Sequence, residues 1–242
     1  MISAVTESLG GRQLPSLTSI LYRGAPMQQE LITRTTPALP GAQLWQAYGQ
    51  TEASPILTLL APEHHGPGDS KARSAGSPVP GCEVTIRHPD TGDEMPQGVV
   101  GEICGTGANV MSGYWHRPDL TESALRDGWL HTGDAGYLDE DGFPFVACRF
   151  DEMIITGGEH VYRTEVESVL CRHPAVAEAA VTGLFDDHPG QWVHVVLVFR
   201  YTREHLAGFM CPRTFEVCGS LPRTGAGKVD KKALASMAVG NG

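Results

Sequence analysis

Residues 127–134 read DGWLHTGD and end in a carboxylate on a glycine-rich loop. They belong to a longer region, residues 76–148, in which short runs of alternating polar and apolar residues are separated by glycine, proline and aspartate. The runs Cys82–Ile86 and Gly101–Cys104 are two examples. Alternation with a period of two residues, interrupted by turn residues, is typical of antiparallel strands. The region therefore predicts a small antiparallel β unit that contains the segment 127–134.

The chain before this β unit has the pattern of an α/β fold. Residues 18–22 and 43–48 are mostly apolar and predict two strands, the second of which ends at Gly49. Between them, Pro26 suits the first position of a helix, because proline lacks an N–H that would have no partner there. We expect this helix to stop before Pro37, because proline interrupts a helix interior.

The chain after Arg149 has the pattern of a compact α+β domain. Residues 153–156, 176–181 and 192–199 predict strands, and a capping box at Thr164 predicts the start of a helix. The sequence therefore predicts α/β and α+β structure divided between two domains, residues 1–150 and residues 151–242.

The composition excludes several classes of protein. The 242 residues carry 18 Lys and Arg against 28 Asp and Glu, a net charge of -10, which argues against nucleic acid or an anionic membrane as the main partner. There is neither an 18-residue apolar stretch for a membrane span nor a signal peptide pattern. The six cysteines form no C-x-x-C pair, and the histidines lack the spacing of a structural metal site. Buried thiols in a reducing compartment are expected, so we predict a cytoplasmic protein.

Two short segments have the chemistry of a nucleotide site. Tyr48–Glu52 (YGQTE) places an aromatic ring, a hydroxyl and a carboxylate within five residues, which could stack on a base, donate to a phosphate and hold Mg²⁺. The carboxylate of Asp134 could accept both hydroxyls of a ribose. Taken singly, each segment fits a plainer interpretation better: an ordinary glycine turn with a solvated glutamate for Tyr48–Glu52, and an aspartate that caps a turn for Asp134.

Two glycine-rich segments lie further along the chain. Gly157 and Gly158 would let a ligand approach the backbone closely, although a hairpin turn explains them as well. Residues 221–228 end in Gly227-Lys228 and suggest a phosphate-binding P-loop. The spacing excludes that motif, because it needs glycine where Pro222 stands and serine or threonine at position 229, which is valine. Lys228 remains a lysine at the tip of a glycine-rich loop.

Taken together and in order, these segments resemble the adenylate-forming superfamily of acyl- and aryl-CoA synthetases, luciferases and peptide-synthetase adenylation domains. The resemblance covers nearly the whole chain, from about Leu14 to Leu234. The pattern is most similar to that of bacterial acyl-CoA synthetases. It rests on the following segments: Gly24–Pro26, Tyr48–Glu52, Ala75–Gly81, Gly113–Trp115, Asp127–Asp134, Arg149, Met153–Glu159, Glu165–Glu167, Pro222–Thr224 and Gly227–Lys228.

The resemblance implies an ATP-dependent ligase that converts a carboxylic acid, with fatty acids as the expected class, to acyl-AMP and transfers the acyl group to coenzyme A. It implies that Glu52 binds Mg²⁺, that Thr51 contacts the α-phosphate, and that Asp134 holds the ribose hydroxyls with help from Arg149. Contacts with the rest of the nucleotide would come from Tyr48, which would stack on adenine, and from Gly24, Ala25, Pro26 and Gly49.

The resemblance also assigns roles to the mobile second domain. Lys228 would be the catalytic lysine of adenylation, which supplies positive charge where two anions join. The domain would then rotate about a hinge at Asp151-Glu152. Gly157 and Gly158 would line the path of the pantetheine arm of coenzyme A.

The sequence departs from the family pattern in two ways. The phosphate-binding loop that the family carries before the Gly-Ala-Pro segment is not in this sequence, and about a dozen residues after Phe199-Arg200 are missing. We therefore expect a truncated chain that holds the carboxy-terminal part of a ligase, with a complementing N-terminal fragment as a candidate partner. The alternative is a non-catalytic protein that binds AMP or a partner.

Overall fold

A computed structural model describes the chain at residues 2–10, 12, 14–24, 27, 29–66, 68–150, 153–156, 159–173, 176, 179–185, 191–196, 214–216, 218, 221–224, 229–230, 233–234 and 236. The chain divides into two compact units, Met1–Val146 and Ala147–Gly242. The expected domain boundary between residues 150 and 151 stays a prediction, because Asp151 and Glu152 lie outside the described residues.

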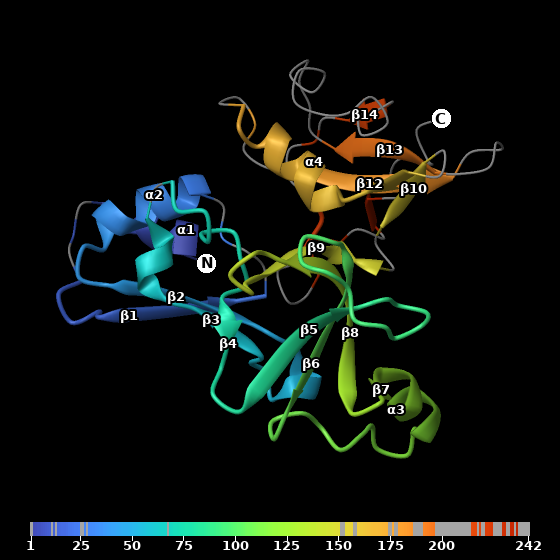
Figure 1. The fold of residues 1–242 in the computed structure, drawn as a ribbon. Helices are drawn as coiled ribbons and strands as arrows, with labels where there is room; N and C mark the ends of the chain where they lie inside the picture. The colour runs from blue at the N-terminus through green and yellow to red at the C-terminus, as the bar shows by residue number, and fades with distance from the viewer. Residues whose placement is uncertain are drawn as a thin grey trace. The chain divides into compact units, whose positions relative to one another are not determined.

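The first unit opens with a four-stranded sheet in the order β1-β2-β3-β4. The strands β1 (Ser19–Arg23) and β2 (Gln43–Tyr48) run parallel and confirm the two strands predicted there. Antiparallel pairing then adds β3 (Thr58–Leu60) and β4 (Ser77–Pro78). Two helices, α1 (Ile2–Ser8) and α2 (Gln29–Ala38), lie together over one face of this sheet (Figure 1). A core of four buried residues lies between these layers: Tyr22, Met27, Ile32 and Leu44.

The predicted end of the first connecting helix is wrong. Helix α2 includes Pro37 and ends at Ala38, and the Leu39 N–H still donates to Thr35 O at 2.9 Å. Proline fixes φ near the helical value, but it has no N–H to donate and its ring clashes with the preceding turn. The last turn of a helix therefore tolerates it better than the interior does.

A second, antiparallel sheet confirms the predicted β unit and belongs to the first unit except for the end of β9, which passes the boundary at Val146. Its path is β5-β6-β8-β7, and β9 also pairs with β8 (Figure 1). The strands are β5 (Cys82–Arg87), β6 (Gly101–Gly107), β7 (Leu125–Arg126), β8 (Trp129–Leu138) and β9 (Pro144–Arg149). Three short helical segments accompany the sheets: η1 (Thr51–Ala53), η2 (Pro62–His65) and α3 (Pro118–Ala124).

The second unit has the expected α+β composition. It contains a hairpin of β10 (Ile154–Thr156) and β11 (Glu159–Val161), the helix α4 (Arg163–Leu170), and a sheet of β12 (Ala180–Phe185), β13 (Gln191–Val196) and β14 (Thr214–Glu216). Among its described residues, one buried cluster comprises Ile154, Val161, Val166, Leu170, Val181, Val193 and Val195, and a second comprises Ala180, Leu221 and Leu234.

Two predicted boundaries in the second unit need correction. Helix α4 begins at Arg163, one residue before the predicted capping box, and its N-cap Tyr162 makes no side-chain cap. The Tyr162 carbonyl accepts the first bonds of the helix, from the N–H groups of Glu165 and Val166. The strand predicted over 176–181 begins only at Ala180, where pairing with β13 starts. Residues 197–213, and with them the predicted deletion near residue 200, lie outside the described residues.

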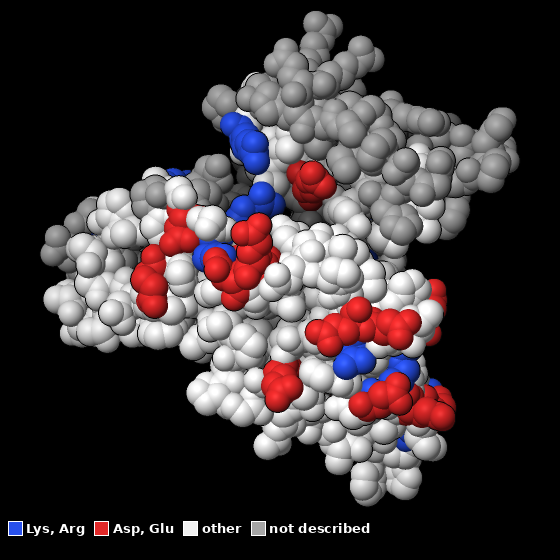
Figure 2. Space-filling view, viewed as in Figure 1, with Lys and Arg blue, Asp and Glu red and all other residues white. Residues whose placement is uncertain are grey.

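The described surface carries both signs of charge. In the view of Figure 2, acidic and basic side chains of the described residues lie close together in mixed patches, without a continuous basic band. Ion pairs account for part of this mixture: Lys71 contacts Asp139 and Asp141, and Arg117 contacts Asp119. Among the residues that the structure describes, no helix has the length and apolar character needed to cross a bilayer.

Candidate nucleotide site

The segment Tyr48–Glu52 leaves the end of β2 through a sharp turn that only glycine fits. Gly49 has φ of +152°, and a Cβ built on it would lie 2.5 Å from Pro55 O. The chain then enters η1, which carries Thr51 at its exposed start and Glu52 half-buried behind it. The predicted loop after this strand is thus a tight turn followed by one short 3₁₀ helix.

The segment Thr132–Asp134 lies within a strand, whereas the sequence suggested a loop. In the pairing of β6 with β8, Glu102 faces Ala135 and Cys104 faces His131. The three residues 132–134 therefore stand opposite Ile103 alone and form a bulge in β8. Gly133 takes φ of +72°, which favours glycine at this position.

The two predicted nucleotide segments meet. The Tyr48 hydroxyl donates to Asp134 Oδ2 at 2.8 Å and lies 3.4 Å from Thr132 Oγ1. These partners are 86 and 84 residues apart in the sequence. Tyr48 and Asp134 are both half-buried. An aromatic ring and a carboxylate thus come together at one place.

Glu52 is held by a residue that sequence reasoning gave no role. The Tyr114 hydroxyl donates to Glu52 Oε1 at 2.6 Å, and the Met111 N–H donates to Glu52 O at 2.7 Å. The hydrogen bond to Glu52 raises the pKa of the Tyr114 phenol. Tyr114 lies in the Gly113–Trp115 segment of the resemblance, which was the only signal for it in the sequence.

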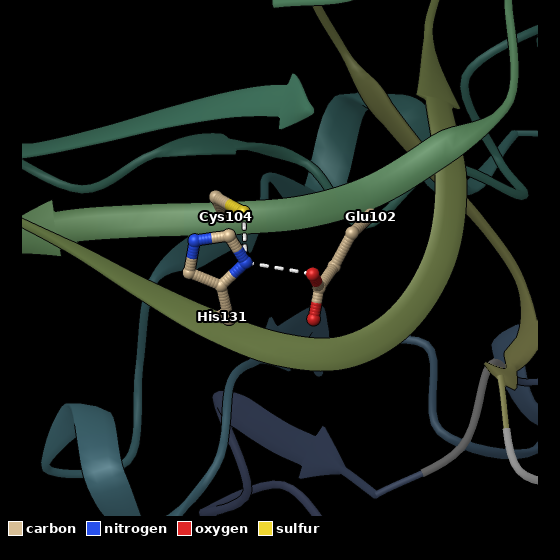
Figure 3. A group of neighbouring side chains, drawn as sticks. All are labelled: Glu102, Cys104 and His131. Carbon is tan, nitrogen blue, oxygen red and sulfur yellow. Dashed lines mark hydrogen bonds and ion pairs between the residues drawn. The ribbon is translucent and has the colours of Figure 1, made fainter. Parts of the chain in front are cut away.

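A second cluster, Glu102, Cys104 and His131, lies on β6 and β8 beside the bulge (Figure 3). Their potential ligand atoms lie within 4.8 Å of one another. His131 Nδ1 lies 2.7 Å from Glu102 Oε2 and 3.4 Å from Cys104 Sγ. Glu102 and Cys104 come from β6, whereas His131 comes from the segment 127–134. Because the strand pairing brings them together, their spacing in the sequence matched no metal motif.

The surroundings of this cluster disfavour a metal ion. Arg126 Nη2 lies 3.1 Å from Glu102 Oε2 and 2.6 Å from His131 Nδ1, so a guanidinium occupies the place beside both groups. Burial, the largest cause, raises the pKa of the Cys104 thiol to about 12, which opposes the thiolate form that metals bind. We therefore interpret the cluster as a buried polar network.

The remaining predicted site residues are distributed over both units. In the first unit, Gly24 follows β1 and has φ of +89°. In the second unit, Arg149 is an exposed residue at the end of β9. Ala25, Pro26, Gly157, Gly158 and Lys228 lie outside the described residues. On either side of the lysine segment, Arg223 and Val229 form an isolated antiparallel bridge.

Two protein-family models match the sequence of this chain. The family model of the AMP-binding enzymes matches residues 1–115. The model of the AMP-binding enzyme C-terminal domain matches residues 165–228. The chain belongs to the adenylate-forming family of AMP-binding enzymes.

Individual members of the family resemble this chain over nearly its full length. A fatty acid–[acyl-carrier-protein] ligase of Streptomyces coeruleorubidus is 37% identical over 238 residues, which are 93% of this chain and 46% of that protein. A feruloyl-CoA synthase of an Amycolatopsis species is 38% identical over 230 residues, which are 90% of this chain and 46% of that protein. The chain thus spans about half the length of these curated relatives.

Solved structures agree with this assignment. The o-succinylbenzoate CoA synthetase of Bacillus subtilis, in complex with its acyl-adenylate intermediate, superposes with a TM-score of 0.83 at 36% identity. The match covers 96% of this chain and 49% of the synthetase. The same synthetase has been solved with ATP and a magnesium ion.

Proposed function

We propose that this AMP-binding chain forms part of the nucleotide site of an ATP-dependent ligase, which activates a carboxylic acid as acyl-AMP and transfers it to coenzyme A. The observation that carries the proposal is the 2.8 Å hydrogen bond between Tyr48 and Asp134, which unites the two segments with nucleotide chemistry. Family membership supports it, because the similar proteins are acid ligases.

Each side chain around this contact suits one part of the nucleotide. The ring of Tyr48 would stack on adenine, and the hydrogen bond from its hydroxyl would hold Asp134 toward the ribose hydroxyls. Thr51 is exposed and would donate to the α-phosphate. Gly49 keeps the backbone free of a side chain at the turn between Tyr48 and Thr51.

The residues also fit a magnesium ion. Mg²⁺ prefers carboxylate oxygens, and Glu52 offers a half-buried carboxylate whose position the Tyr114 hydroxyl restrains. We propose that Glu52 holds the ion. When bound, Mg²⁺ neutralises charge on the phosphates during the attack of the carboxylate. Tyr114 keeps Glu52 oriented and satisfies part of its hydrogen-bonding capacity.

The remaining roles are proposed from the family pattern alone. Lys228 would stabilise the adenylation transition state, and Gly157 with Gly158 would admit coenzyme A. Arg149 would assist Asp134, and the residues Gly24, Ala25 and Pro26 would border the adenine. We further propose a fatty acid substrate, a cytoplasmic location, and an N-terminal fragment that completes the phosphate site.

The test is calorimetric titration of the 242-residue chain with AMP and with ATP–Mg²⁺. We expect saturable AMP binding that Asp134→Asn weakens at least tenfold, about 1.4 kcal/mol, because hydrogen bonds to a charged acceptor are the stronger ones. Asp90→Asn, the same change at an exposed turn residue, is the matched control and should leave the affinity unchanged.

Three outcomes separate the alternatives. Binding of AMP by the chain, together with acyl-AMP formation once an upstream fragment of a relative is added, supports the ligase. Binding without acyl-AMP formation in that mixture supports a non-catalytic AMP-binding protein. A folded circular-dichroism spectrum without any nucleotide binding contradicts the proposed site.

A further inference from the structure

We propose that Glu102 is a positioning residue that holds the Thr132–Asp134 bulge, and with it the nucleotide-facing carboxylate of Asp134. The inference rests on the proposed role of Asp134 in binding nucleotide. Glu102 itself lies on β6 and is 6% exposed, so it acts through the bulge and does not face a ligand directly.

The argument starts from the backbone groups of the bulge. Residues 132–134 stand opposite Ile103 alone, so the β6–β8 register is interrupted at Gly133. The Thr132 hydroxyl bridges the interruption, because it donates to Ile103 O at 2.7 Å and accepts the Asp134 N–H at 3.1 Å. The Gly133 N–H donates to Glu102 Oε1 at 3.0 Å. One carboxylate oxygen of Glu102 thus binds the backbone at the middle residue of the bulge.

The second oxygen of Glu102 anchors the carboxylate. Oε2 lies 3.1 Å from Arg126 Nη2 on β7 and 2.7 Å from His131 Nδ1 on β8. If His131 Nδ1 carries a proton, it donates to Glu102. If it carries none, it accepts from Arg126, and Arg126 still pairs with Glu102. The carboxylate is therefore held from β7 in both cases. A buried carboxylate needs such partners, because an unpaired buried charge is costly.

These contacts link the buried network to the site. Glu102 fixes Gly133, the neighbour of Asp134, while Tyr48 holds the Asp134 carboxylate from the other sheet. Two sheets thus set the position of one side chain. Loss of Glu102 would free the Gly133 amide and let the bulge take other conformations, so that nucleotide binding would have to order it again.

The test compares Glu102→Ala and Glu102→Gln with the wild-type chain, by Gly133 amide hydrogen exchange and by AMP affinity. In Glu102→Ala we expect Gly133 exchange to accelerate at least tenfold and AMP binding to weaken about tenfold. In Glu102→Gln the amide oxygen still accepts from Gly133, so we expect exchange within about threefold of wild type and a smaller loss of affinity. Glu83→Gln, at an exposed carboxylate on β5, should change neither quantity.

A purely structural role predicts a different pattern. It would lower the melting temperature of Glu102→Ala but leave Gly133 protected and the AMP affinity unchanged in the folded protein, which would overturn the inference. If Glu102→Ala does not fold, the amide proton shift of Gly133 in Glu102→Gln decides. We expect the Gly133 amide proton resonance to move upfield in Glu102→Gln, because an amide oxygen is a weaker acceptor than a carboxylate. An unchanged resonance would contradict the hydrogen bond between Gly133 and Glu102.

The same experiment separates this inference from the proposed function. If the wild-type chain binds no AMP, the proposed nucleotide site is wrong, whereas Gly133 exchange still reports whether Glu102 holds the bulge. If the wild-type chain binds AMP and both Glu102 variants match it in exchange and affinity, the proposed function stands and the positioning role fails.

Discussion

The phenol of Tyr48 makes contacts that reach across the first unit. Its hydroxyl lies on β2 of one sheet, and its partners Asp134 and Thr132 lie on β8 of the other. Tyr114 plays a comparable part for Glu52. At the scale of single residues, the candidate site therefore consists of acidic groups whose positions are set by tyrosine hydroxyls.

The contribution of the Tyr48 hydroxyl is measurable by deleting it alone. We expect Tyr48→Phe to retain ring stacking but to weaken AMP binding about three- to fivefold, because one hydrogen bond to a charged acceptor is lost. Calorimetric titration measures this change. Tyr137→Phe, whose ring stacks on Phe145 away from these contacts, is the matched control. An unchanged affinity in Tyr48→Phe would mean that the contact with Asp134 does not serve nucleotide binding.

At the scale of elements, Gly76, just before β4, is the described glycine at which an added Cβ would meet the shortest contact. Gly76 has φ of +87°, and a Cβ on it would lie 2.1 Å from Leu59 C in β3. No rotamer change relieves that contact, because the obstructing atoms are backbone. The pairing of β3 with β4 therefore depends on glycine here.

A pair of glycine variants tests this dependence. We expect Gly76→Ala to lower the free energy of unfolding by about 3 kcal/mol or more, through strain and displacement of β3. Gly92→Ala has a similar φ of +77° but open space around the new Cβ, so it should cost only about 1 kcal/mol. Urea denaturation of both variants measures the difference. Equal losses would show that left-handed strain alone accounts for the effect.

At the scale of the whole molecule, the proposed reaction uses residues from both units. Tyr48, Glu52 and Asp134 belong to the first unit, whereas Arg149 and Lys228 belong to the second. The family scheme needs this division, because a lysine that assists adenylation must leave before a thiol can attack. The two half-reactions should therefore depend differently on the second unit.

Lys228→Ala separates those half-reactions in a chain complemented with an N-terminal fragment of a relative. We expect acyl-AMP formation to fall at least about 100-fold, because a fixed positive charge is lost from the transition state. Thioester formation from supplied acyl-AMP should change less than about threefold. Pyrophosphate release and thioester appearance measure the two steps, with Lys231→Ala as the control. Equal losses in both steps would contradict the assigned role.

Local patterns along the chain were enough to predict the α/β and antiparallel regions, because burial on one face imposes a period of two on strands such as 82–86. Ordered motifs were enough to single out Tyr48, Glu52 and Asp134. Helix ends were predicted less well, since α4 begins at Arg163 without a side-chain cap, whereas the signal at Thr164 suggested a later start.

The sequence by itself thus determined the family and most of the residues that carry the proposed chemistry. Only the tertiary structure decided that Tyr48 meets Asp134, that residues 132–134 form a bulge, and that Glu102 and Tyr114 contact Gly133 and Glu52. Glu102 lies in an ordinary alternating strand, and its function depends on a β6–β8 register that local periodicity does not encode. Contacts between residues tens of positions apart arise from sheet pairing and packing, which no short segment specifies.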